Sequence, residues 1–183
     1  MLFNIQLTPM TLALIAYPEL ISDDNNRIES LRRDHDDLYS IIKAHFTLIF
    51  PINELSEGAF LNGVESMIED VKRISFVARC ATINKDALRP FYHAFLVLDE
   101  GNSDVIKLHD LFYNSPVFRK FHRLDIDYIP HVVLASSQHA QTIKNLVDQW
   151  NLSKIEIKGR INSIEVVKIE AGSVNTLRTI KLV

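Results

Sequence analysis

Two short stretches of the chain combine a histidine with the alternating pattern of a β-strand. They are His45-Phe46-Thr47-Leu48 and His131-Val132-Val133-Leu134. Because side chains alternate across a strand with a period of two, His45 and Thr47 share one face while Phe46 and Leu48 take the other. The second stretch repeats this outline. Each stretch therefore predicts a strand with one apolar face and one face that begins with an imidazole.

Two such imidazoles suit acid–base chemistry if they face each other. The unperturbed pKa of histidine is about 6.5, so one ring can be neutral while the other is protonated near neutral pH. One ring would deprotonate an attacking hydroxyl or water while the other protonates the leaving oxygen. A hydroxyl two residues along the same face, as in Thr47, would stabilise charge on a nonbridging phosphate oxygen. The pattern favours phosphodiester chemistry that requires no metal.

Hydrophobic periodicity predicts the elements that must position these strands. Each histidine strand lies between two predicted helices, so the order predicts one structural unit used twice and indicates an α+β or α/β class with mixed sheets. In chain order we expect a strand at 11–17, a capped helix carrying Ile28 to Leu38, the His45 strand, a helix at 56–73, strands at 75–84 and 92–99, a helix after 101–104, the His131 strand, a helix after 136–137, and strands at 163–170 and 176–183.

Composition restricts the function classes. With 183 residues, 47% of them hydrophobic, the chain fits one domain or two small lobes that share a core. A net charge of −3 is unlike the basic footprint of proteins that grip long nucleic acids, so any such contact should be local. The single cysteine, Cys80, is expected to be a buried, inert thiol in a reducing cytosol. The apolar run at 11–17 is too short to span a bilayer and lacks the basic flank of a signal peptide.

The two histidine stretches resemble the paired His-x-Thr/Ser-hydrophobic motifs of the two-histidine phosphoesterases, which include the bacterial 2'-5' RNA ligases and cyclic phosphodiesterases. The order of predicted elements is similar over nearly the whole chain. The resemblance implies an α+β fold of the 2'-5' RNA ligase type. In that fold, two pseudo-symmetric lobes with antiparallel or mixed sheets are flanked by helices and enclose a central cleft, here as a single domain over residues 1–183.

The resemblance also implies a function. It predicts a phosphoesterase that acts on a 2',3'-cyclic phosphate or a 2'-5' phosphodiester of a small nucleotide or RNA end, with His45 and His131 as catalytic residues and Thr47 as a phosphate-binding residue. Val133 stands where the family usually has a hydroxyl residue, and valine cannot donate a hydrogen bond. No cofactor, metal, membrane or long nucleic acid is expected, and the protein should be a cytosolic monomer.

Two other functional interpretations remain open. Because of Val133, the chain could be a weak or inactive protein that keeps the cleft to bind a nucleotide or RNA end. It could also be an interaction domain in which His45 and His131 are incidental core residues. The sequence contains no glycine-rich phosphate loop, no Cys or His cluster at metal-ligand spacing and no serine nucleophile elbow, which argues against those site types.

Other polar residues near the second motif are secondary candidates. The basic group Arg119, Lys120 and Arg123 precedes it and could reach phosphates at the mouth of the cleft, although such a run is more often a solvated face. Tyr128 could stack on a base or hydrogen-bond a phosphate. His93 opens a strand too, but its place before the third helix suggests a structural role. The remaining histidines are expected to be solvated: His35, His109, His122 and His139.

Overall fold

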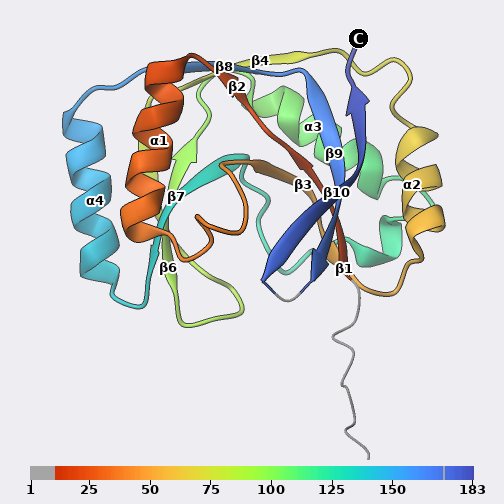
Figure 1. Cartoon of the computed structure of the whole chain (residues 1–183), viewed down its shortest axis with the longest axis horizontal. Coiled ribbons are helices and arrows are strands. Elements are labelled where there is room, and N and C mark those ends of the chain that lie inside the picture. Colours follow the sequence, from red (N-terminus) through yellow and green to blue (C-terminus); the bar gives the residue numbers. More distant parts are fainter. Residues whose placement is uncertain (1–10, 171) are drawn as a thin grey trace, which may run out of the picture.

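The computed structural model describes residues 11–170 and 172–183, and in this part of the chain three antiparallel sheets are flanked by four α-helices (Figure 1). The strand orders are β10-β9-β1-β3, β2-β8-β4 and β5-β6-β7. The strands are β1 Thr11–Ala16, β2 Glu19–Leu20, β3 Phe46–Ile52, β4 Ile74–Ala78, β5 Cys80–Lys85, β6 Tyr92–Val97, β7 His131–Ser137, β8 Ile157–Ile161, β9 Ser163–Glu170 and β10 Ser173–Lys181. The helices are α1 Ser22–His35, α2 Glu57–Glu65, α3 Asn102–Tyr113 and α4 Ala140–Leu152, with a short 3₁₀ helix η1 at Arg119–Phe121.

The two motif strands occupy equivalent places. β3 is the last strand of its sheet, and β7 is the last strand of another. Helix α1 precedes β3 in sequence but packs against β7, whereas α3 precedes β7 and packs against β3. Each half of the chain therefore supplies the helix that supports the other half's motif strand, and the fold class expected from the sequence is confirmed.

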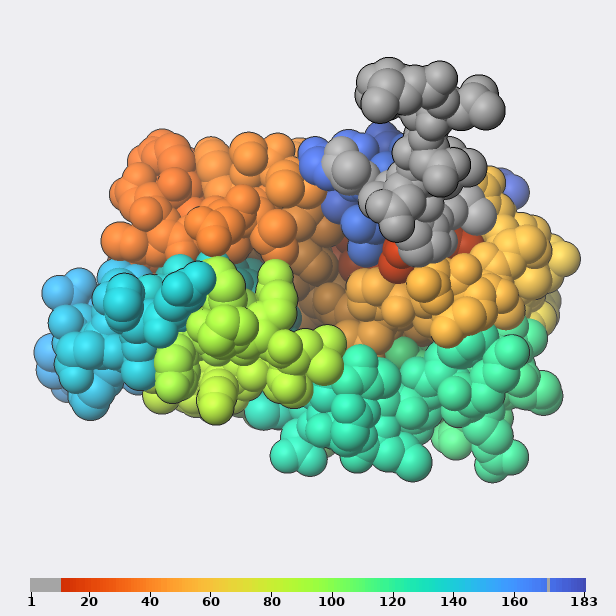
Figure 2. Space-filling view, turned by 90° about the horizontal axis from the view of Figure 1, so that it is seen from below, coloured from red at the N-terminus to blue at the C-terminus, as the bar shows by residue number. Residues whose placement is uncertain are grey.

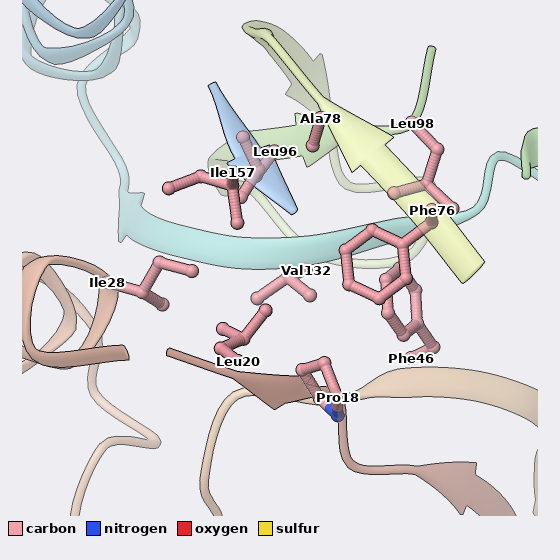
Figure 3. A pocket seen from close by; sticks show the side chains of 10 residues that line it. All are labelled: Pro18, Leu20, Ile28, Phe46, Phe76, Ala78, Leu96, Leu98, Val132 and Ile157. Carbon is pink, nitrogen blue, oxygen red and sulfur yellow. The ribbon is translucent and has the colours of Figure 1, made fainter. Parts of the chain in front are cut away.

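The period-two pattern of the motif strands is confirmed as well. Phe46, Leu48, Val132 and Leu134 are buried, whereas the motif side chains between them are only half-buried. The buried faces meet in one core. Phe46 and Val132 both line a small apolar cavity of about 10 Å³, which is closed by side chains from β2, α1, β4, β6 and β8 (Figure 3). This shared core fixes the position of one motif strand relative to the other.

Two predicted helices are shorter than their apolar periodicity indicates. α1 ends at His35, and residues 36–45 form turns instead of carrying the helix past Leu38. α2 ends at Glu65 rather than at residue 73, and the hydroxyl of its C-cap residue Ser66 donates to the carbonyl of Gly63. Ile68 is still buried in the turns that follow. Apolar side chains at helical spacing can thus reach the core from irregular backbone.

The predicted strand at 75–84 is two strands in two different sheets. The break falls at Arg79, whose guanidinium bonds the carboxylates of Asp99, Glu100 and Glu156. β2 and β8 are two further strands that were not predicted from the sequence. β8 belongs to a stretch whose apolar residues alternate from 155 to 161, so the signal was present. Cys80, expected to be buried, is partly exposed. Within the described residues, no helix has the length and apolarity needed to cross a membrane.

Candidate active site

His45 lies directly before β3, at the end of the irregular segment 36–45. Its Nδ1 is 2.8 Å from the carbonyl oxygen of Lys43. Because a carbonyl oxygen only accepts, the proton of the neutral ring must sit on Nδ1, which leaves the lone pair on Nε2. The backbone therefore selects the tautomer in which Nε2 can exchange a proton with a substrate.

His131 repeats this arrangement at the start of β7. Its Nδ1 is 2.5 Å from the carbonyl oxygen of Ile129, two residues earlier, just as Lys43 lies two residues before His45. The same tautomer is selected, and Nε2 is again the free nitrogen. Two independent halves of the chain thus prepare an imidazole in the same way, which is not expected of incidental core histidines.

The two imidazoles interact electrostatically. Burial lowers the pKa of His131 most strongly, to about 4, although the hydrogen bond to Ile129 opposes this effect, and the positive charges of His45 and His93 lower it further. Burial also lowers the pKa of His45. Burial therefore favours the neutral form of both motif rings, and a positive charge on His45 disfavours a second one on His131. β3 and β7 are in contact, which agrees with this coupling.

An aromatic side chain lies against each motif histidine. The ring of Phe95 in β6 stacks on His131 with a centroid distance of 3.5 Å and an interplanar angle of 14°. Tyr17 meets His45 edge to face, with centroids 6.4 Å apart. Neither residue was singled out from the sequence. Phe95 lies on the strand next to β7, and Tyr17 directly follows β1, the strand next to β3, so only strand order and register could have identified them.

Thr47 and Val133 follow the two histidines on the same strand faces, and both are half-buried. Ile15 lies opposite Thr47 and Phe95 lies opposite Val133. Among the described residues, the Thr47 hydroxyl has no hydrogen-bond partner and remains available for a ligand. Val133 offers only methyl groups. The site therefore has one motif hydroxyl rather than two.

The secondary candidates near the second motif are already engaged or lie outside the strands. The Tyr128 hydroxyl donates to the backbone carbonyl of Thr47 at 2.9 Å, and burial raises the pKa of this phenol. Arg123 forms two hydrogen bonds to Asp125, and Arg119 is an exposed residue of η1. Their roles in substrate binding stay predictions. The geometry gives Tyr128 a different contact, because it ties the segment before β7 to the first motif strand.

The prediction for His109 was wrong, because this residue is buried rather than solvated. Its Nδ1 donates to the carbonyl of Leu48 at 2.9 Å, and its ring stacks on Tyr128 at 3.6 Å. The hydroxyl oxygen of Tyr113, also from α3, accepts a hydrogen bond from the backbone N–H of Phe50 at 3.0 Å. These side chains hydrogen-bond backbone groups on the edge of β3 that pairs with no described strand, which explains why polar residues of α3 point inward.

His93 lies closer to the site than its expected structural role suggests. Its ring stacks on Phe95 with centroids 5.8 Å apart, and Nε2 is 3.2 Å from a carboxylate oxygen of Asp86.

Figure 2 shows a recess between the orange segment around α1, the yellow-green hairpin of β5 and β6, and the teal segment before β7. In residues 11–170 and 172–183, no group of three or more His, Cys, Asp or Glu side chains is arranged to hold a metal ion.

Comparisons with known proteins agree with this geometry. The structure of E. coli LigT complexed with 3'-AMP has 13% sequence identity and a TM-score of 0.58, and the match covers 95% of this chain and 98% of that one. A crystal structure described as a phosphoesterase has 12% identity and a TM-score of 0.56, with 95% and 99% covered. Usb1 of Kluyveromyces marxianus has 8% identity and a TM-score of 0.52, with 92% and 97% covered.

These likenesses show the fold. No curated protein sequence matches the chain significantly. The model of one protein family, described as the 2'-5' RNA ligase superfamily, matches residues 20–173, a span that includes both histidine motifs. The chain therefore belongs to the 2'-5' RNA ligase superfamily of two-histidine phosphoesterases.

Proposed function

We propose that this protein is a phosphoesterase that acts on a 2',3'-cyclic phosphate or a 2'-5' phosphodiester of a small nucleotide or RNA end. The observation that carries the proposal is the matched anchoring of two imidazoles, each with Nδ1 on the carbonyl two residues earlier and with Nε2 free. Membership of the superfamily supports the reaction class. The proposed chemistry needs no metal, because both proton transfers are assigned to histidine.

In this proposal His131 is the general base and His45 the general acid. For a cyclic phosphate, Nε2 of neutral His131 takes a proton from water as the water oxygen forms a bond to phosphorus. The bond from phosphorus to one ribose oxygen breaks, and that oxygen receives the proton from Nε2 of His45. Two observations support this assignment: the pKa of His131 is lowered by burial and by the charge of His45, and the carboxylates of Glu29 and Asp36 raise the pKa of His45. In the ligation direction the roles exchange.

Thr47 is the proposed phosphate ligand. Its unpartnered hydroxyl lies on the His45 face of β3, where it can donate to a nonbridging oxygen as charge develops in the transition state. The ligand is expected to be compact, because the chain carries a net charge of −3 and Arg123 is neutralised by Asp125. A reducing compartment such as the cytosol suits a chain with one cysteine, and we propose that the protein acts as a monomer.

The test is hydrolysis of adenosine 2',3'-cyclic monophosphate by the purified protein, followed by chromatography of the products. His45→Ala and His131→Ala should each reduce kcat by ~10²-fold or more, as expected for loss of a general acid or base. His139→Ala is the matched control, because His139 is an exposed histidine before α4. Unchanged turnover in both motif variants would exclude this mechanism.

A nucleotide-binding protein without turnover is the second candidate, and Val133 is the observation that favours it. The missing hydroxyl removes one donor to the phosphate, and such a donor is worth ~10²-fold or more in kcat. Calorimetry that detects binding of the cyclic nucleotide, together with no product after prolonged incubation, would support this function over the enzymatic one.

A further inference from the structure

Arg32 is a buried charge on the inner face of α1. Only 2% of this residue is exposed, and it shares the inner face of α1 with Ile28. Arginine is rarely buried to this extent, since removal of its charge from water costs several kcal/mol unless it is paired and hydrogen-bonded. An aliphatic residue would fill this helix position at lower cost. The arginine therefore calls for an explanation beyond packing.

Every nitrogen of the Arg32 guanidinium is bonded. Nη1 donates to both carboxylate oxygens of Glu29, at 3.0 and 3.1 Å. Nε donates to Asp36 at 3.0 Å, and Nη2 donates to the carbonyl of Ile42 at 2.7 Å. The planar fork of arginine can make this set of bonds, whereas the single ammonium of lysine cannot. One side chain thus joins the helix to two points of the segment that follows it.

The two carboxylates extend this network along the same segment. Glu29 accepts from the backbone N–H of Ala44 at 2.8 Å, and Asp36 accepts from the N–H of Leu38 at 3.1 Å. Residues 36–45 contain no helix or strand, so these bonds stand in for the missing ladder. Lys43 lies between two of the fixed points, and its carbonyl is the one that accepts from His45 Nδ1.

We propose that Arg32 is a positioning residue, which with Glu29 and Asp36 fixes residues 36–44 and so holds the Lys43 carbonyl where it orients the His45 imidazole. The inference rests on the proposed function of His45 but adds a residue that lies outside both motifs. The His131 side is held differently, because Tyr128 anchors the segment before β7 to the Thr47 carbonyl and Phe95 stacks on the ring. The two halves of the site therefore resemble each other at the histidines and differ behind them.

The network also makes the surroundings of the two rings electrostatically different. Two carboxylates accompany one guanidinium, so a net negative charge lies behind His45. The pKa of His45 is lowered by burial, raised by the Lys43 carbonyl, lowered by Arg32 and raised by Asp36 and Glu29. The titratable groups that face or couple to this ring come from β1, α1 and the segment after it, and β7: Tyr17, Glu29, Arg32, Asp36 and His131. This charge favours the proton-donor role of His45.

The first experiment compares Arg32→Lys with Arg33→Lys. Arg33 is adjacent and exposed, and among the described residues its guanidinium has a hydrogen bond to Ser30 and an ion pair with Asp34, both on the same helix. In Arg32→Lys, the His45 ring should lose its preference for the Nδ1–H tautomer, as read from ring ¹⁵N chemical shifts. A small displacement of a catalytic group can cost ~10²-fold, so kcat for the cyclic nucleotide should fall ~10-fold or more with KM changed by less than about twofold. Arg33→Lys should match wild type.

The second experiment protects the test against a variant that does not fold. Glu29→Gln keeps the shape and the Ala44 contact but removes one negative charge, so the pKa of His45 should fall by roughly half a unit in an NMR titration. Asp34→Asn is the control, because Asp34 is an exposed carboxylate of the same helix. A wild-type tautomer in folded Arg32→Lys, or an unchanged pKa of His45 in Glu29→Gln, would overturn the inference. These ring measurements need no substrate, so they decide it even if the cyclic nucleotide is not turned over.

Discussion

The ring of Phe95 covers His131, and its removal gives a sharp test of why that histidine stays neutral. The two rings are stacked with centroids 3.5 Å apart, and burial is the largest cause of the low pKa of His131, about 4. Phe95→Leu keeps an apolar residue on β6 but removes the flat face. Water can then reach the imidazole, and we expect the pKa of His131 to rise.

Two effects of opposite sign compete in this variant. An aromatic face can stabilise an imidazolium by ~0.5–2 kcal/mol, and its loss alone would lower the pKa further. In the native protein, desolvation of the His131 imidazolium outweighs this aromatic stabilisation. The pKa of about 4 lies 2.5 units below 6.5, which is equivalent to about 3.4 kcal/mol. The charges of His45 and His93 remain in the variant. We therefore expect a partial return, of about one unit, rather than a full one.

The assay is the pH dependence of kcat/KM for the cyclic nucleotide, supported by NMR titration of the His131 Cε1–H. If His131 is the general base, the acid limb should move up by about one unit, so that the neutral fraction at pH 5 falls from roughly nine-tenths to roughly half. Phe91→Leu is the control, because the Phe91 ring has a cation–π contact with the Arg89 guanidinium and no described contact with His131. An acid limb that stays in place or moves down in folded Phe95→Leu would refute this account of His131.

Three further predictions follow from the same contacts. Between pH 6.5 and 4 the unfolded chain takes up a proton at His131 whereas the native state does not, so the free energy of unfolding should fall by at most about 3 kcal/mol as the pH falls through this window. In urea titrations, the free energy of unfolding of His131→Gln should depend less steeply on pH than that of wild type. Equal pH dependence in the two proteins would contradict the pKa shift. Val133→Thr should raise kcat and Thr47→Val should lower it by ~10²-fold, measured with the cyclic nucleotide; a neutral Thr47→Val would remove Thr47 from the site. Tyr128→Phe leaves the Thr47 carbonyl without its donor and should lower the free energy of unfolding by about 1 kcal/mol, with no change in a urea titration as the contrary result.

The fold around the motifs could be predicted where one rule decided the outcome. A period of two was enough to assign opposite faces to His45 and Phe46, because one residue of slip would have buried the imidazole face. Apolar spacing was not enough to end a helix, since Ile68 reaches the core from a turn after α2. The break at Arg79 depends on carboxylates from distant parts of the chain, so no local pattern could have revealed it.

The candidate site was predictable in its motif residues and not in what surrounds them. Phe95 reaches His131 through the pairing of β6 with β7, and strand order could not be derived from the sequence. Arg32 looks like an ordinary charge on a polar helix, and its burial becomes evident only when residues 36–45 fold over it. His109 was predicted to be solvated for the same reason, because its hydrogen-bond partner is the carbonyl of Leu48 on β3, far away in the chain.

The central claim is that His45 and His131 act as one acid–base pair, and a double-variant comparison tests it most directly. The turnover of adenosine 2',3'-cyclic monophosphate would be measured for wild type, His45→Ala, His131→Ala and the double variant. Residues that act as a unit are not additive, so the double variant should be about as slow as the slower single variant. Losses that multiply, or a single variant with wild-type turnover, would contradict the pairing.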